Sequence, residues 1–306
     1  MGVTRRDVLK VLAGGSAAAV LAGGRAEATE EEVGAGPDAA GLLYDAARCI
    51  GCRACMVACN QANGLPPDRS LFGGLYQAPA SLNAQTKNII KLYRSEDGQE
   101  RSFVKQQCMH CVDPACVSGC PMRSLHKAEQ GIVAWDPDLC IGCRYCQIAC
   151  PFNIPRFEWE KVNPKIVKCE LCRHLLAKGE AQPACSRVCP TRAVIFGKRA
   201  ELLGEAKRRI AEHPGVYYEK RVYGEHEGGG TQVLYLSRVP FEKLGLPALG
   251  KKSLAGGMRH LENLIYRGFL TPILAYGGLV AILKGRWEEH LREHHAGKSP
   301  GKEKQG

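Results

Sequence analysis

The residues of this 306-residue chain that could do chemistry are its sixteen cysteines, which make up about 5% of the sequence. They fall in four tight groups: Cys49, Cys52, Cys55 and Cys59; Cys108, Cys111, Cys116 and Cys120; Cys140, Cys143, Cys146 and Cys150; Cys169, Cys172, Cys185 and Cys189. Thiols so close together are poorly placed for disulfides, which need suitable separations between their α-carbons. The grouping therefore favours metal binding.

The spacing within the groups indicates which metal. Groups one and three read C-x2-C-x2-C-x3-C, a pattern typical of bacterial ferredoxins that carry two clusters. Two-residue gaps let a short loop give three thiolates to three irons of one cubane. The fourth cysteine, expected at the start of a helix, binds the partner cluster, so the groups should work in crossed pairs. We therefore predict four 4Fe-4S clusters.

Zinc and incomplete sites are the competing interpretations of the same cysteines. Zinc sites use two CxxC pairs, which would leave the middle cysteine of each triple without a role. One or two clusters with vestigial remaining groups is disfavoured because all four groups are complete. A zinc-stabilised scaffold that docks respiratory subunits without carrying electrons stays open as a function of another class.

Other polar residues beside the cysteines are less specific. Positive side chains next to predicted ligands could raise cluster potentials or be ordinary solvated charges: Lys105, Arg144, Lys168 and Arg173. His110 and His174 are also near ligands, but with all ligand positions filled by cysteine we expect structural or surface roles. No nucleophile–base pair or carboxylate dyad stands out, so we expect a non-catalytic protein.

The net charge of +11 would ordinarily suggest a nucleic-acid partner. Without residues 1–28, which carry four basic and two acidic side chains, the charge is +9. Sixteen thiolates on four cores of about +2 each would add roughly −8. The basic excess therefore compensates cluster charge, and we expect no nucleic-acid binding.

The elements that must position the groups are short. Residues 88–94 and 101–107 read as a hairpin leading into group two, and further strands are expected at 131–135, 193–196 and 232–236. Residues 199–212 have helical periodicity and end at a stop signal, His213-Pro214-Gly215. Residues 65–85 and 241–257 read as long loops.

Both ends carry targeting signals. Arg5 and Arg6 precede an apolar Gly/Ala-rich run, and Arg25 precedes a small-residue cleavage site, which is typical of a twin-arginine export signal over residues 1–28. Residues 268–283 lack charge, and at 1.5 Å per residue they cover about 24 Å of a hydrocarbon core of about 30 Å. We expect a marginal transmembrane anchor at 258–287 with a polar cytoplasmic tail at 288–306, against the alternative of a buried or interfacial helix.

Several stretches together resemble a known family. They are LYD from Leu43, QCMHCVDPACVSGCP from Gln107, GCRYCQIACPFNIP from Gly142, KCELC from Lys168, AVIFG from Ala193 and YGEHEGGGTQVLYL from Tyr223. The chain resembles the four-cluster ferredoxin-like subunits of respiratory oxidoreductases, and most closely the iron-sulfur subunits of membrane-bound nickel-iron hydrogenases of the hydrogenase 2 type. The cysteine framework alone is shared with partner subunits of molybdenum enzymes. The resemblance to the hydrogenase subunits in particular rests on the export signal, the glycine-rich segment and the C-terminal anchor together.

The resemblance implies four ligand sets. They are Cys49, Cys52, Cys55 and Cys189 (cluster 1); Cys59, Cys169, Cys172 and Cys185 (cluster 2); Cys120, Cys140, Cys143 and Cys146 (cluster 3); and Cys108, Cys111, Cys116 and Cys150 (cluster 4).

It also implies an α+β fold of two pseudo-symmetric ferredoxin-like modules with loop and hairpin insertions, plus the C-terminal transmembrane helix. The body would be residues 29–198, followed by an extension and linker at 199–257.

The implied function is electron transfer on the periplasmic face of the bacterial inner membrane. Electrons from the small and large subunits of a nickel-iron hydrogenase would pass along the clusters to an integral membrane subunit that reduces quinone, and the C-terminal helix would contact the bilayer. The alternative within the same chemistry is the electron-transfer subunit of a molybdopterin oxidoreductase for polysulfide, sulfoxide or nitrogen oxides.

Overall fold

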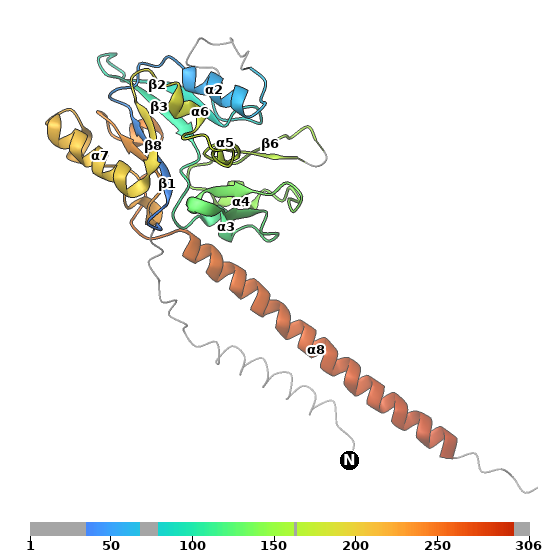
Figure 1. Ribbon diagram of the computed structural model, residues 1–306. Helices are drawn as coiled ribbons and strands as arrows, with labels where there is room; N and C mark the ends of the chain where they lie inside the picture. The colour runs from blue at the N-terminus through green and yellow to red at the C-terminus, as the bar shows by residue number, and fades with distance from the viewer. Residues whose placement is uncertain (1–34, 68–78, 162–163, 297–306) are drawn as a thin grey trace, which may run out of the picture. The chain divides into compact units, whose positions relative to one another are not determined.

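A computed structural model describes residues 35–67, 79–161 and 164–296 (Figure 1). The predicted export signal therefore lies outside the described residues. By contacts the chain divides into two units, and the larger one, residues 31–259, contains every cysteine. This unit is called the body below.

A three-stranded sheet in the order β8-β1-β9 forms the middle of the body (Figure 1). Strand β1 (Ala40–Asp45) pairs antiparallel with β8 (Val194–Lys198) and parallel with β9 (Val233–Leu236). All six residues of β1 are buried, and because side chains alternate along a strand, both faces of β1 are therefore covered. Leu43 packs toward helix α7 (Arg199–Glu212), whereas Leu42 and Tyr44 pack into a core that includes cysteines.

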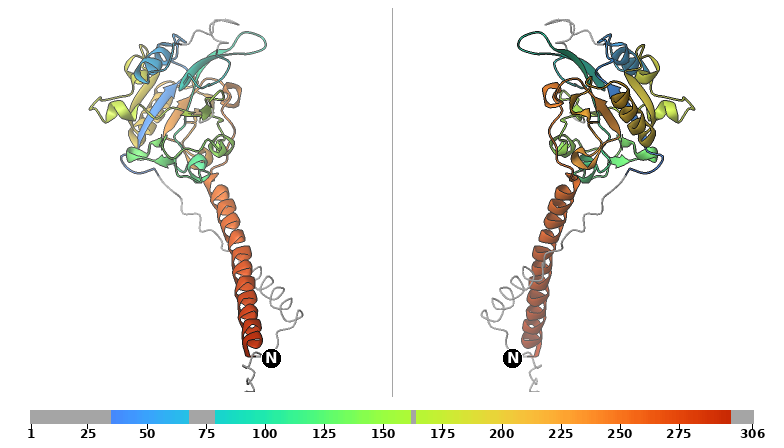
Figure 2. Two further views of the ribbon diagram at one scale, coloured as in Figure 1. Left: turned by 90° about the vertical axis from the view of Figure 1, so that its right-hand side faces the viewer. Right: turned by 90° about the vertical axis from the view of Figure 1, so that its left-hand side faces the viewer.

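The predicted hairpin is confirmed as β2 (Asn88–Arg94) and β3 (Arg101–Gln107), which pair in full register (Figure 2). The predicted helix is confirmed as α7. The other predicted strands begin one or two residues later than expected, as β5 (Val133–Trp135), β8 and β9. Residues 129–131 form a 3-10 turn, with Gln130 in a left-handed conformation that a strand does not allow.

The remaining body elements are short and surround the cysteine groups. Strand β4 (Leu125–Lys127) pairs with β5, and β6 (Arg156–Phe157) pairs with β7 (Ile166–Val167). The helices are α2 (Ala54–Ala62), α3 (Ala115–Ser118), α4 (Tyr145–Ala149), α5 (Arg173–Leu176) and α6 (Ala184–Arg187). Short 3-10 turns lie at Glu129–Gly131, Tyr218–Lys220, Glu227–Gly229 and Glu242–Leu244, the last inside a predicted loop.

Helix α8 (Ala255–Ala296) contains Pro272 and includes the segment predicted as an anchor. Within the described part of the chain, no helix combines the length and apolarity that a membrane span requires. The start of α8 is held to the body: Ser253 Oγ accepts the Ala255 amide at 3.1 Å, and the Arg259 guanidinium binds both oxygens of Asp113 at 2.8 and 2.9 Å. Asp113 lies between Cys111 and Cys116, so this ion pair joins the helix start to a predicted ligand loop.

Candidate iron-sulfur centres

The ligand loops repeat one backbone shape. Groups one and three share the pentapeptide Cys-Ile-Gly-Cys-Arg, and the residue before the second cysteine has a positive φ in all four groups: Gly51 (71°), His110 (47°), Gly142 (69°) and Leu171 (49°). This left-handed residue turns the chain between the first two thiols. At Gly51 a side chain is also excluded by space, because a β-carbon would lie 2.4 Å from the ring of Phe103.

The fourth cysteines of groups one and three do not lie at the start of a helix, so this prediction is wrong. Helices α2 and α4 begin directly after Arg53 and Arg144, which are both left-handed N-cap residues. Cys59 therefore lies late in α2, and Cys150 is the C-cap of α4. Cys55 and Cys59 are four residues apart on one helix, close to one turn, so α2 presents them one above the other.

Two cavities are lined by four cysteines each. One is lined by Cys49, Cys52, Cys55 and Cys189, the residues expected for cluster 1. The other is lined by Cys59, Cys169, Cys172 and Cys185, the residues expected for cluster 2. Each set joins three thiols of one group to one thiol of a distant group.

The other eight cysteines, those of groups two and three, form two further sets. Cys146 is influenced by the charges of Cys120, Cys143 and Cys140, and burial is the main reason that its thiol pKa rises to about 12. Cys111 interacts with Cys108, Cys116 and Cys150, and burial, followed by these neighbours, raises its pKa well above the usual value. These neighbours are the sets expected for clusters 3 and 4.

Burial dominates the acidity of the thiols. It raises the pKa of Cys55 and Cys59 to about 12, and of Cys108 and Cys185 to about 11. Thiols with such pKa values are protonated at neutral pH, so binding to iron, which requires thiolates, releases their protons.

Backbone amides point at several sulfurs. The Gly51 amide donates to Cys49 Sγ at 3.5 Å, and the Leu171 amide donates to Cys169 Sγ at 3.4 Å. At Cys150 three amides, those of Phe152, Asn153 and Ile154, lower a thiol pKa that burial raises. Amide donors of this kind stabilise charge on cluster sulfur.

Two of the buried donors that lack a hydrogen-bond partner among the described residues lie beside predicted ligands. Gln107 Nε2 is one, in a side chain that lines the cavity of Cys59, Cys169, Cys172 and Cys185. His110 is the other: its Nδ1 accepts the Val133 amide at 3.1 Å, so Nε2 carries the hydrogen and is left unpaired. Burial and two nearby lysines hold the His110 pKa well below normal, so the ring stays neutral. Sulfur acceptors of a cluster fit these orphaned donors.

The described residues contain no group of three or more His, Cys, Asp or Glu side chains placed to hold a single metal ion. The four thiolates of a cubane bind four different irons and do not converge on one point. The two cavities, the amide donors and the orphaned polar atoms fit such a group, which supplies one-electron redox chemistry when bound.

Five further side chains lie next to predicted ligands in the sequence: four cations and His174. The four cations differ in whether they are buried or exposed. Lys105 and Lys168 are 1% and 3% exposed, whereas Arg144 and Arg173 are exposed. Arg144 stacks on Trp159, and Arg173 pairs with Glu170. His174 is an exposed residue whose ring contacts the Ala62 carbonyl at 2.8 Å, which fits its expected surface role.

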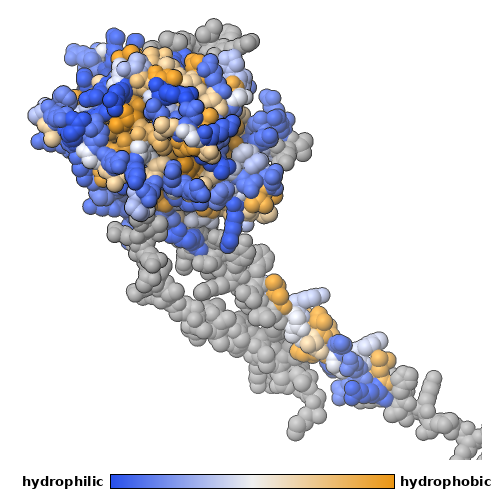
Figure 3. All heavy atoms as spheres, viewed as in Figure 1, coloured by the Kyte–Doolittle hydropathy of each residue, from blue (hydrophilic) through white to orange (hydrophobic). Residues whose placement is uncertain are grey.

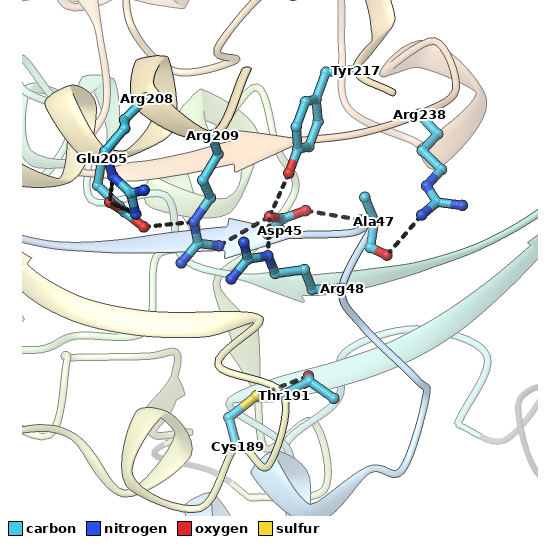
Figure 4. A network of polar contacts seen from close by, with 10 residues as sticks. All are labelled: Asp45, Ala47, Arg48, Cys189, Thr191, Glu205, Arg208, Arg209, Tyr217 and Arg238. Carbon is cyan, nitrogen blue, oxygen red and sulfur yellow. Dashed lines mark hydrogen bonds and ion pairs between the residues drawn. The ribbon is translucent and has the colours of Figure 1, made fainter. Parts of the chain in front are cut away.

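A buried ion-pair network that the sequence did not reveal holds the chain segment that leads into cysteine group one (Figure 4). Asp45, the last residue of β1, is fully buried and accepts Arg209 Nη1 at 2.9 Å and the Tyr217 hydroxyl at 3.0 Å. Arg48 approaches it at 3.5 Å, and the Ala47 amide donates to its other oxygen at 3.0 Å. The network ties α7 to the strand end four residues before Cys49.

Comparison with known proteins matches the same regions. Two models described as "4Fe-4S dicluster domain" match residues 41–121 and 99–199. The hydrogenase-2 operon protein HybA of Escherichia coli O157:H7 is 38% identical over 294 residues, covering 85% of this chain and 88% of that protein.

The chain belongs to the HybA family of 4Fe-4S dicluster proteins. Formate dehydrogenase iron-sulfur subunits are also relatives: the nitrate-inducible one of Escherichia coli K12 is 35% identical, covering 85% of this chain and 86% of that protein, and the one of Haemophilus influenzae is 32% identical, covering 83% of each. A HybA-like chain with two dicluster domains carries four 4Fe-4S clusters, as the cysteine groups predict.

Proposed function

We propose that this HybA-like chain is a non-catalytic electron-transfer subunit that relays electrons from a periplasmic nickel-iron hydrogenase to a quinone-reactive membrane subunit. The observation that carries the proposal is the convergence of sixteen cysteines from four sequence groups into four neighbouring sets, two of which line cavities. We assign the four sets as the ligands of clusters 1 to 4.

The electrostatic interactions between thiols of different sets support one linear order of clusters. Cys55 of cluster 1 interacts with Cys185 of cluster 2, so these two clusters are neighbours. Cys108 of cluster 4 interacts with Cys169 of cluster 2. Cys116 of cluster 4 interacts with Cys146 of cluster 3. The order 1-2-4-3 follows, with clusters 1 and 3 at the ends.

The two ends share a surface character that suits electron entry and exit. The exposed cysteines are Cys52 in cluster 1 and Cys143 in cluster 3. Exposed apolar side chains accompany both ligand loops: Ile50 and Val57 at cluster 1, and Ile141, Tyr145 and Ile148 at cluster 3. On the face of the body shown in Figure 3, hydrophobic residues are exposed between hydrophilic ones. Exposed apolar side chains around an exposed ligand are typical of a surface that binds a protein partner. Such a partner would exclude water from the electron-transfer contact.

The direction along the wire is inferred from the start of α8. Arg259 binds Asp113 in the ligand loop of cluster 4, which precedes cluster 3 in the order. The proposed anchor follows this attachment point in the sequence, and the attachment point is nearer to cluster 3 than to cluster 1 along the order. We propose that electrons enter at cluster 1 from the hydrogenase and leave at cluster 3.

We further propose export by the twin-arginine route and a single-pass anchor in α8. The support is the paired arginines at residues 5 and 6, the uncharged run 268–283, and the exposure of apolar side chains such as Ile273, Tyr276 and Leu283 along the helix. A folded protein carries its clusters through this route already ligated, which protects thiols from an oxidising compartment.

Purification of the complex from membranes tests the partner. We expect nickel-iron hydrogenase subunits to copurify. The formate dehydrogenase relatives favour a second candidate, the same relay beside a molybdopterin enzyme. Recovery of a molybdopterin protein as the large subunit would refute the hydrogenase partner and leave the relay intact.

A further inference from the structure

Two buried lysines lie at the junctions between the cluster sites. Lys105 in β3 is 1% exposed and lines the cavity of the cluster 2 cysteines. It also interacts electrostatically with Cys55 of cluster 1 and with Cys59, Cys169 and Cys185 of cluster 2. The side chain therefore lies at the cluster 2 site and within electrostatic reach of cluster 1.

Lys168 has an equivalent place at the next junction. It is 3% exposed, and its ammonium donates to the Val133 carbonyl and, at 3.1 Å, to the carbonyl of Cys169, a cluster 2 ligand. Its charge acts on Cys108, Cys116 and Cys150, which belong to cluster 4.

A buried ammonium needs a counter-charge. Lys105 donates to Gln107 Oε1, and neither lysine forms an ion pair with a carboxylate among the residues that the structure describes. A 4Fe-4S cluster with four thiolates has a charge of about −2 when oxidised and −3 when reduced. The cluster can therefore supply the counter-charge, and a fixed cation favours the reduced state by attraction that little solvent screens.

We propose that Lys105 raises the reduction potentials of clusters 1 and 2 and that Lys168 raises the potential of cluster 4, so that the clusters at these two junctions stay reducible. The inference rests on the proposed four-cluster relay. It separates these lysines from Arg144 and Arg173, whose exposure leaves their charges to solvent. Lys127, which donates to the Cys111 carbonyl at 3.0 Å, also faces cluster 4 but is exposed.

The test is an anaerobic redox titration of the full chain in its complex, followed by EPR. Lys105→Met and Lys105→Gln remove the charge, Lys105→Arg keeps it, Lys168→Met addresses the other junction, and Arg173→Met is the matched exposed control. Iron and sulfide content is measured for every variant.

We expect each neutral variant to keep its four clusters and to reduce the affected cluster with an equilibrium constant at least about tenfold lower, which is about 59 mV for a one-electron couple. Lys105→Arg and Arg173→Met should titrate like wild type. The Lys105 and Lys168 variants should shift the midpoint potentials of different EPR signals. A variant that combines Lys105→Met with Lys168→Met should shift both.

Unmoved midpoints in Lys105→Met and Lys105→Gln, or a shift in Lys105→Arg as large as theirs, would overturn the proposal. Loss of a cluster from both neutral variants while Lys105→Arg keeps all four would also count against it, since the lysine would then be needed for assembly. A wild-type chain without reducible clusters would instead refute the proposed function before any variant is compared.

Discussion

Replacing Arg209 by Met should loosen the part of the body that presents the first cysteine group. The change removes the strongest partner of Asp45, which is fully buried, from a pair whose atoms lie 2.9 Å apart. Breaking a buried pair by removing one partner typically costs about 3–5 kcal/mol, because a charge stays buried without compensation. Tyr217 and Arg48 still reach Asp45, so we expect the lower value, about 3 kcal/mol.

A loss of about 3 kcal/mol raises the population of locally open molecules about 100-fold. Iron released from clusters into a chelator under anaerobic, native conditions reports this population when reclosing is faster than trapping. Arg209→Met should therefore release its first irons about 100-fold faster than wild type. Asp45→Asn combined with Arg209→Met should recover part of the loss, because the uncompensated charge is gone.

Arg208→Met provides the control. Arg208 pairs with Glu205 and Glu212 on the same helix but is solvent-exposed, so its removal should leave iron release unchanged. Equal release rates in the Arg209 and Arg208 variants would refute the reasoning that the buried network fixes the entry to group one.

Three further outcomes are expected. Cys59→Ser should damage cluster 2 as seen by EPR, and damage confined to cluster 1, the site of Cys49, would show that the ligation is not crossed. Truncation before Arg267 should release the isolated subunit from membranes into the soluble fraction, whereas unchanged detergent dependence would argue against the anchor. Arg259→Met should leave all clusters in place but speed hydrogen exchange at the first amides of α8, because Asp113 loses both of its charged hydrogen bonds; unchanged exchange there would mean that the ion pair does not hold the helix start.

The cysteine spacing was enough to predict the cofactor because ligand loops are local: two-residue gaps fix which thiols can reach one cubane. The hairpin β2–β3 and helix α7 were also predictable, since each follows a strong local period with clear end signals.

The helix boundaries at the cysteines were not predictable in the same way. Arg53 and Arg144 adopt left-handed N-cap conformations that their residue type does not signal, so α2 and α4 begin earlier than expected and carry the third cysteine of each group. Which cations are buried was equally hidden. Lys105 and Arg173 look alike in sequence, and only the packing of β3 against the cluster 2 cavity separates them.

The Asp45 network depends on contacts across more than 160 residues of sequence, between β1 and α7. Nothing local in Asp45 or Arg209 indicates the partner. Such long-range polar pairs can be recognised only once the fold is known, whereas the spacing of the cysteines can be read directly from the sequence.

Metal analysis of the purified chain, combined with spectra before and after reduction, tests the central claim most directly. Four 4Fe-4S clusters predict about sixteen irons and a matching amount of acid-labile sulfide per chain, with signals that appear on one-electron reduction. Stoichiometric zinc with no reducible signal would contradict the electron-transfer account and leave only a docking scaffold.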